Sequence, residues 1–214
     1  MRKVKSIEEI SLSQKAYDFL REKIINNKLK PGEPISESFV RNELGVSRTP
    51  IREALKLLEK ENFVKVYPKR GAFITPISLD KIQEIYQIRE IIEGGVACQV
   101  AAYISVEELS EIEKKLNLFR RSEGQDLEEA VLLGQELHRL IFKTFGNETL
   151  TQFIEALWID ISRGCGFISG KSGNALKFLD QHLKIIDALK KRDGERAKIL
   201  TVEHLQDAKK SILA

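Results

Sequence analysis

The chain has 214 residues, of which 42% are hydrophobic and 31% charged, with 5 prolines and 13 glycines. Such a chain can bury a core, which excludes disordered, collagen-like and low-complexity proteins. No run approaches the roughly 20 apolar residues of a membrane helix, and the first residues lack the apolar stretch of a signal peptide, so we expect a cytoplasmic protein without a membrane partner. Cys98 and Cys165 are expected to be reduced core residues.

The charge of the chain changes sign near residue 77. Residues 1–77 hold 16 basic and 10 acidic residues, a net charge of +6, whereas residues 78–214 hold 19 and 22, a net charge of −3. We therefore expect two domains with these boundaries. A basic domain joined to a slightly acidic one suggests that only the first contacts a polyanion, although ordinary scatter in surface charge would give a similar imbalance.

The first domain has the pattern of a winged helix-turn-helix. A capping box at Ser11 to Gln14 opens the first predicted helix, Gly45 ends the second, and Ser47 can cap the third. Two short alternating segments around a turn then predict a hairpin. The predicted elements are helices at about 12–27, up to 44 and 47–60, and strands at 63–67 and 72–75.

The third helix carries residue types suited to the major groove of DNA. Arg48 and Arg52 lie four residues apart on one face, and either guanidinium can make two hydrogen bonds to a guanine. Hydroxyls at the helix N-terminus can hold phosphates, and a glycine at the hairpin tip allows close approach to a minor groove. A lone pair of arginines would more often only solvate a helix. The candidate DNA-binding residues are Ser47, Arg48, Thr49, Arg52, Arg70 and Gly71.

Three runs in this domain, LKPGE (29–33), ELGVSRTPIREAL (43–55) and LEKENFV (58–64), resemble the N-terminal domain of the GntR family of bacterial transcription regulators. The resemblance covers residues 12–75. It implies that Arg48 and Arg52 contact bases or phosphates, that Thr49 contacts a phosphate, and that the wing contact lies at 70–71. Ser38 departs from the pattern, because many members place a DNA-contacting arginine there.

Every periodic stretch of the second domain is helical. The predicted fold is therefore mainly α: an N-terminal winged helix-turn-helix followed by an all-helical bundle that acts as a sensory domain. The helices of the second domain are expected near 79–103, 106–122, 127–145, 148–168, 174–192 and 195–212.

All three histidines of the chain lie in the helical domain. His182 and His204 stand 11 residues before and after Asp193, which marks a helix-helix turn. In an antiparallel hairpin both would lie about 16 Å from the turn, at the same height, so their imidazoles can meet. With His138 they would form a facial set of nitrogen ligands suited to zinc, nickel or another divalent transition metal. A helical histidine that stands alone is more often a surface or hydrogen-bonded core residue.

This half resembles the FCD sensory domain of the FadR-type branch of the same regulators. The resemblance rests on Arg89 and Glu93, on the runs at 137–139 and 146–150, and on His182 and His204 with their neighbours. It implies that the three histidines are metal ligands and that Arg89 and Glu93 bind an effector. Gly134 stands where many members carry a ligating aspartate. The site is therefore expected to be weaker, completed by water or an effector carboxylate, or without metal.

The leading interpretation is a regulator, not an enzyme, that binds a pseudo-palindromic operator in double-stranded DNA as a homodimer and responds to a small organic acid. An apolar stripe of Ile82, Ile85, Ile92 and Val96 could form the dimer contact, although such a stripe is more often core. The alternative is a metal-dependent hydrolase with a three-histidine site, but no H-E-x-x-H motif is present. A helical adaptor without DNA binding would not explain the basic domain.

Overall fold

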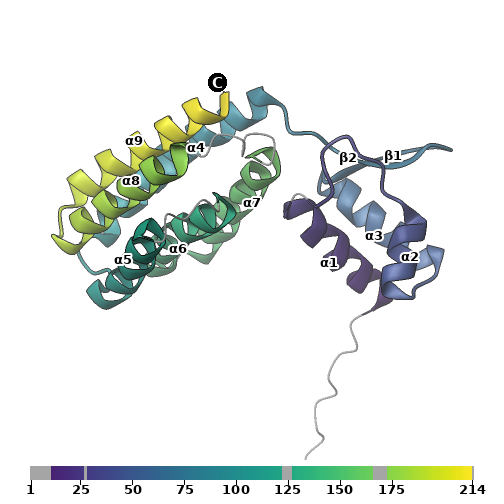
Figure 1. Ribbon diagram of the computed structural model, residues 1–214, viewed down its shortest axis with the longest axis horizontal. Coiled ribbons are helices and arrows are strands. Elements are labelled where there is room, and N and C mark those ends of the chain that lie inside the picture. Colours follow the sequence, from purple (N-terminus) through teal and green to yellow (C-terminus); the bar gives the residue numbers. More distant parts are fainter. Residues whose placement is uncertain (1–10, 27, 122–126, 166–172, 214) are drawn as a thin grey trace, which may run out of the picture. The chain divides into compact units, whose positions relative to one another are not determined.

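A computed structural model describes residues 11–26, 28–121, 127–165 and 173–213. The chain forms two compact units, Met1–Ile77 and Ser78–Ala214, and each is described by itself (Figure 1). The predicted ends of three segments, at residues 27, 122 and 166–168, lie outside the described residues.

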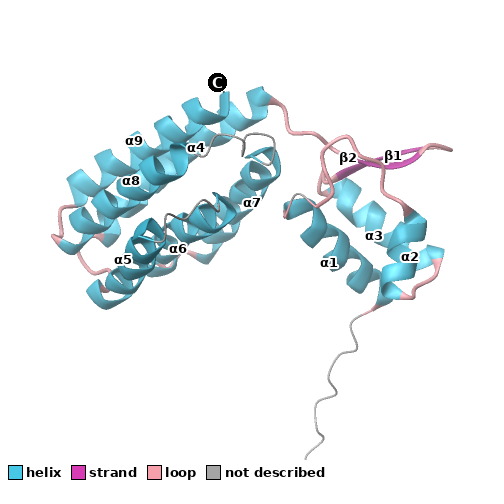
Figure 2. Cartoon of the chain, viewed as in Figure 1, coloured by secondary structure: helices cyan, strands magenta, loops and turns pink. Residues whose placement is uncertain are grey.

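The first unit contains three helices and a two-stranded hairpin (Figure 2). Its elements are α1 (Leu12–Ile25), α2 (Glu37–Leu44), α3 (Arg48–Lys60), β1 (Val64–Tyr67) and β2 (Gly71–Ile74). The strands are antiparallel with Val64 opposite Ile74, and Pro34 bridges to Phe73 at the edge of the hairpin. The predicted winged helix-turn-helix is confirmed.

The helix-turn-helix is fixed by one apolar face and one glycine. In α3 the residues Ile51, Ala54 and Leu58 are fully buried, so the opposite side of the helix faces outward. Gly45 ends α2 with a φ of 65°, a left-handed conformation that costs glycine least. Ser47 occupies the N-cap position of α3, but its side chain makes no capping hydrogen bond, so that part of the prediction is wrong.

The second unit is a bundle of helices. The helices that the structure describes in it are α4 (Leu79–Val100), α5 (Val106–Arg121), α6 (Leu127–Phe145), α7 (Glu148–Cys165), α8 (Gly173–Lys190) and α9 (Gly194–Leu213). Helix α9 packs along both α4 and α8, and α6 contacts α4, α5 and α8. Among the described segments, every helix is too short or too polar to span a bilayer.

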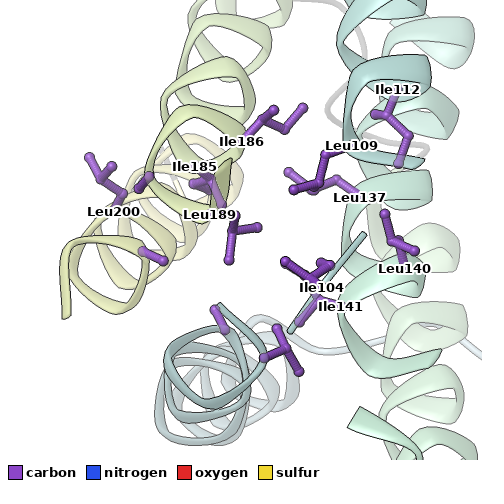
Figure 3. Close-up of a cluster of buried hydrophobic side chains, with 14 of the residues drawn as sticks. Ile104, Leu109, Ile112, Leu137, Leu140, Ile141, Ile185, Ile186, Leu189 and Leu200 are labelled. Carbon is purple, nitrogen blue, oxygen red and sulfur yellow. The ribbon is translucent and has the colours of Figure 1, made fainter. Parts of the chain in front are cut away.

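A single apolar cluster holds this bundle together (Figure 3). Side chains from α5, α6, α8 and α9 meet in it, and Leu109, Leu137, Ile185 and Leu189 are completely buried. Full burial of each such side chain stabilises the fold by about 1.5–3 kcal/mol.

Two sequence expectations for α4 need correction. Ile82, Ile85 and Val96 are at most 4% exposed, so the stripe proposed for dimer contact is intrachain core. Cys98 is half-buried rather than a core residue. The side chain of Cys165 is not among those that the structure describes, so the expectation for it stays a prediction.

The glycine pair of α4 has two different environments. A Cβ on Gly94 would lie 2.8 Å from Val202 of α9, so this glycine permits close helix packing. A Cβ on Gly95 would meet no described atom within 4 Å. Packing within the described chain therefore explains Gly94 and leaves Gly95 unexplained.

Candidate functional site

The N-terminal end of α3 presents an exposed polar surface. Ser47, Arg48, Thr49 and Arg52 are all exposed. The side chain of Arg52 is 65% exposed, and its Nε lies 3.4 Å from Oε1 of Glu37. An exposed ion pair of this kind is worth at most about 1 kcal/mol, so the guanidinium can exchange it for a nucleic-acid contact at little cost.

The wing tip is basic and allows close approach. Gly71 has a φ of 94°, and a Cβ there would meet no described atom within 4 Å, so the backbone at this point is accessible. The Arg70 guanidinium lies 5.9 Å from the ring centre of Tyr67, which holds it beside the strand. Both residues predicted for the wing contact are exposed.

The three histidines meet inside the bundle. His138 of α6, His182 of α8 and His204 of α9 are buried, and one possible ligand nitrogen from each lies within 4.8 Å of the others. The ring centres of His182 and His204 are 4.3 Å apart. The two Nε2 atoms of His138 and His182 are 3.4 Å apart.

This cluster could hold a metal ion. Zinc bound to two imidazoles at about 2.0–2.1 Å with tetrahedral angles would hold their nitrogens about 3.3 Å apart, close to the 3.4 Å between Nε2 of His138 and Nε2 of His182. Burial lowers the pKa of His182 to about 3 and also brings the pKa of His204 well below its usual value, so both rings are neutral, as metal ligation requires. Nδ1 of His182 is buried without a hydrogen-bond partner in the described chain, which is costly unless something occupies the site.

Glu93 of α4 is the nearest carboxylate to the cluster that the description gives, and it is only 1% exposed. Its Oε1 accepts hydrogen bonds from Arg89 and, at 3.1 Å, from the Trp158 indole. Its Oε2 lies 2.7 Å from Nδ1 of His138, the distance of an ion pair, but it has no partner in the described chain that meets the geometry of a hydrogen bond. Burial alone would raise the pKa of Glu93, but Arg89 and His138 outweigh it and hold the pKa well below the usual range, so the carboxylate is ionised.

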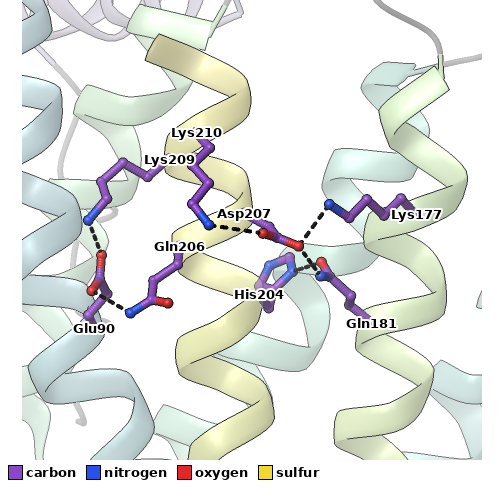
Figure 4. Close-up of polar contacts among 8 residues, drawn as sticks. All are labelled: Glu90, Lys177, Gln181, His204, Gln206, Asp207, Lys209 and Lys210. Carbon is purple, nitrogen blue, oxygen red and sulfur yellow. Dashed lines mark hydrogen bonds and ion pairs between the residues drawn. The ribbon is translucent and has the colours of Figure 1, made fainter. Parts of the chain in front are cut away.

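His204 makes a hydrogen bond with Gln181, a residue of α8. Its Nδ1 lies 3.1 Å from Oε1 of Gln181, and Nε2 of Gln181 donates to Asp207 at 2.9 Å (Figure 4). Lys177 binds the same carboxylate at 2.8 Å. The hydrogen bond from Lys177 is the largest cause that lowers the pKa of Asp207, so this group is an ionised acceptor.

Gly134 lies directly against the cluster. A Cβ there would be 2.5 Å from Cε1 of His182 and 3.1 Å from each of its ring nitrogens. The His182 ring thus occupies the space that a side chain at position 134 would need.

Sequence reasoning identified the three histidines, Arg89 and Glu93, and the structure brings all of them together. It missed Trp158 and Gln181, although Gln181 adjoins His182 in the sequence. Glu136, which lies two residues before His138 on α6, binds Lys115 at 2.7 Å. No general base therefore faces the histidines from that position.

A winged helix-turn-helix followed by a helical bundle with a buried polar site defines the class of two-domain, DNA-binding transcription regulators. The family model "Bacterial regulatory proteins, gntR family" matches residues 12–74, and the FCD domain model matches residues 84–207. The chain belongs to the GntR family and carries an FCD domain. These families and the relatives below are regulators rather than enzymes, so the hydrolase alternative is not supported.

Relatives match over most of the chain. The HTH-type transcriptional repressor RspR of Escherichia coli K12 is 29% identical over 94% of this chain and 89% of its own length. The HTH-type transcriptional regulator YdhC of Bacillus subtilis is 32% identical over 88% of this chain and 85% of its own length. The solved structure of E. coli McbR/YncC has the same fold, with a TM-score of 0.79, 22% identity, and coverage of 96% of this chain and 98% of that one.

Proposed function

We propose that a small carboxylate-bearing effector controls operator binding by this regulator, and that it binds at a divalent metal ion held by His138, His182 and His204. The observation that carries the proposal is the convergence of three buried imidazole nitrogens within 4.8 Å of one another. Such a set suits zinc or nickel. His138, His182 and His204 would hold the ion, which would act as a Lewis acid toward an anionic ligand.

The charges around the cluster support an anionic effector. Neutral imidazoles leave a divalent cation uncompensated, and the nearby Glu93 is already paired with Arg89. Because Gly134 supplies no carboxylate, a carboxylate from the ligand would neutralise the ion in a low-dielectric site. Arg89 remains the proposed anchor for a second part of the effector, whereas the contacts of Glu93 within the protein favour a supporting role.

DNA binding through α3 gives the first prediction. We expect Arg52→Ala to weaken binding to an operator selected from random duplexes by about 1–3 kcal/mol, or about 5- to 150-fold, without unfolding the chain. The physical reason is that Arg52 shares an exposed face with Arg48 at the helix N-terminus. Fluorescence anisotropy at fixed salt measures the change, and Lys60→Ala at the far end of α3 is the matched control. Unchanged affinity of the Arg52 variant would contradict the assignment of α3 to the major groove.

We further propose that the chain acts as a homodimer through one face of α4. Ile91 is 78% exposed, and Ile88 and Gly95 lie one turn to either side of it on the same face. A glycine inside a helix costs about 1 kcal/mol relative to alanine, and nothing in the described chain packs on Gly95. A second copy of α4, crossing close to Gly95, would account for both features. Two winged helices related by a two-fold axis would then bind a pseudo-palindrome.

This surface gives the second prediction. We expect Ile91→Glu to raise the dimer dissociation constant by about 10²- to 10⁴-fold, because two symmetry-related isoleucines each lose about 1.5–3 kcal/mol of burial. Sedimentation velocity measures the change, and Leu118→Glu, at an exposed position of α5, is the control. A dimer as tight as that of the unaltered chain would rule out this face.

A further inference from the structure

We infer that Glu93 and Gln181 are positioning residues that fix the proton of His138 and of His204 on Nδ1, so that both rings direct an unprotonated Nε2 toward the metal. The inference rests on the metal site of the proposed function and adds the groups that prepare it. Neither residue is a ligand in this scheme.

Glu93 is bound by Arg89, a permanently charged group that can only donate hydrogen bonds. The Oε2 of Glu93 is 2.7 Å from Nδ1 of His138, where an unprotonated nitrogen would set one lone pair against another, so Nδ1 carries the proton. Arg89 and Trp158 hold the other oxygen and keep the carboxylate in place. The lone pair of a neutral His138 is then on Nε2, the atom that faces His182.

The tautomer of His204 is set through the side-chain amide of Gln181. Asp207 is an ionised acceptor, so the group of Gln181 that faces it at 2.9 Å must be the NH₂. The amide oxygen of Gln181 therefore faces His204, and Nδ1 of His204 must donate to it. Asp207 thus sets the orientation of Gln181, and Gln181 sets the tautomer of His204 (Figure 4).

His182 differs from the other two. No described group accepts from its Nδ1, and its Nε2 lies 3.4 Å from the unprotonated Nε2 of His138. Without metal, His182 therefore donates from Nε2 to His138. Of the three rings it is therefore the one that leaves an unpartnered lone pair on Nδ1 in the described chain.

The test uses the whole 214-residue chain and zinc as the probe. Nitrogen-15 NMR of the metal-free protein at about pH 8, above the ordinary histidine pKa, reports the protonated nitrogen of each ring. We expect Nδ1–H for His138 and His204 and Nε2–H for His182. Glu93→Gln and Gln181→Leu should each weaken zinc binding by about 10- to 100-fold, the usual cost of losing a group that orients a ligand.

Two comparisons make the test decisive. Glu90→Gln is the matched control, because Glu90 lies one turn before Glu93 on α4 and its hydrogen bonds go to Lys209 and Gln206 of α9 rather than to a histidine. Its zinc affinity should equal that of the unaltered chain. If the unaltered chain binds zinc but Gln181→Leu binds it equally well, or if His204 carries its proton on Nε2, the inference is wrong while the metal site stands. If the unaltered chain binds no zinc, the proposed metal site fails and the inference fails with it.

Discussion

Replacing His182 and His204 together by alanine is expected to abolish metal binding and the response to effector while leaving operator binding intact. Loss of a group that merely orients a ligand costs about 10- to 100-fold in metal affinity. Removing two of the three ligands should therefore cost at least about 10²-fold. The winged helix-turn-helix is a separate compact unit, so its affinity for operator in the absence of effector should not change.

Three measurements check this double variant. Elemental analysis reports bound metal, and calorimetry reports affinity for the organic acid that mass spectrometry finds in the unaltered protein. Anisotropy reports release of operator on adding that acid. A ligand at 100 times its dissociation constant stabilises the protein by about 2.7 kcal/mol, so the zinc-dependent rise in thermal stability should also disappear. Retention of both metal and the full effector response would mean that the histidines are only packed core residues.

Under the proposed function, coupling between the histidine cluster and operator binding would require two arrangements of the proposed dimer. Helix α4 carries Arg89 and Glu93 beside the histidines and Ile91 on its exposed face. The same helix begins at Leu79, five residues after the end of β2 at Ile74. Effector bound beside α4 can shift the spacing of the winged helices only if it binds one dimer arrangement more tightly than the other. For this reason the double variant should bind operator but fail to release it.

The meeting of His182 and His204 could be predicted from the sequence because it depends on local rules. Helix rise and the turn at Asp193 fix the relative height of residues on α8 and α9, and the two rings do meet. The exposed face of α3 was predictable for a similar reason, since the spacing of its apolar residues shows which side is buried. Both predictions depend only on the helical period of the apolar residues and, for the two histidines, on the position of the turn at Asp193.

Other features depend on packing between distant segments, which periodicity does not determine. Trp158 reaches Glu93 across 65 residues, and no local pattern marks that pair. The stripe considered for dimer contact proved to be largely intrachain core, because spacing identifies an apolar face but not what covers it. Helix α9 covers one side, at Gly94 and Val202, and leaves Ile91 exposed.

Gly134 offers the sharpest difference between family resemblance and this structure. The resemblance treats the position as a lost aspartate, so restoring a side chain there would be expected to strengthen metal binding. In this chain a Cβ at 134 would lie 2.5 Å from Cε1 of His182, well inside van der Waals contact. The buried ring would have to move, and it packs against both other histidines. The absence of a side chain at position 134 therefore leaves the space that the His182 ring occupies.

We accordingly expect Gly134→Ala to weaken zinc binding by about 10- to 100-fold, the scale of a misoriented ligand. Alanine is favoured over glycine in a helix by about 1 kcal/mol, so the metal-free variant should remain folded even as its affinity falls. Gly134→Asp adds the same Cβ and should bind zinc no more tightly than the unaltered chain. Competition with a zinc-binding dye measures all three proteins, and Gln135→Ala, the next residue on α6, is the control. Tighter binding by Gly134→Asp would show that His182 moves aside, which would contradict the role assigned to the glycine.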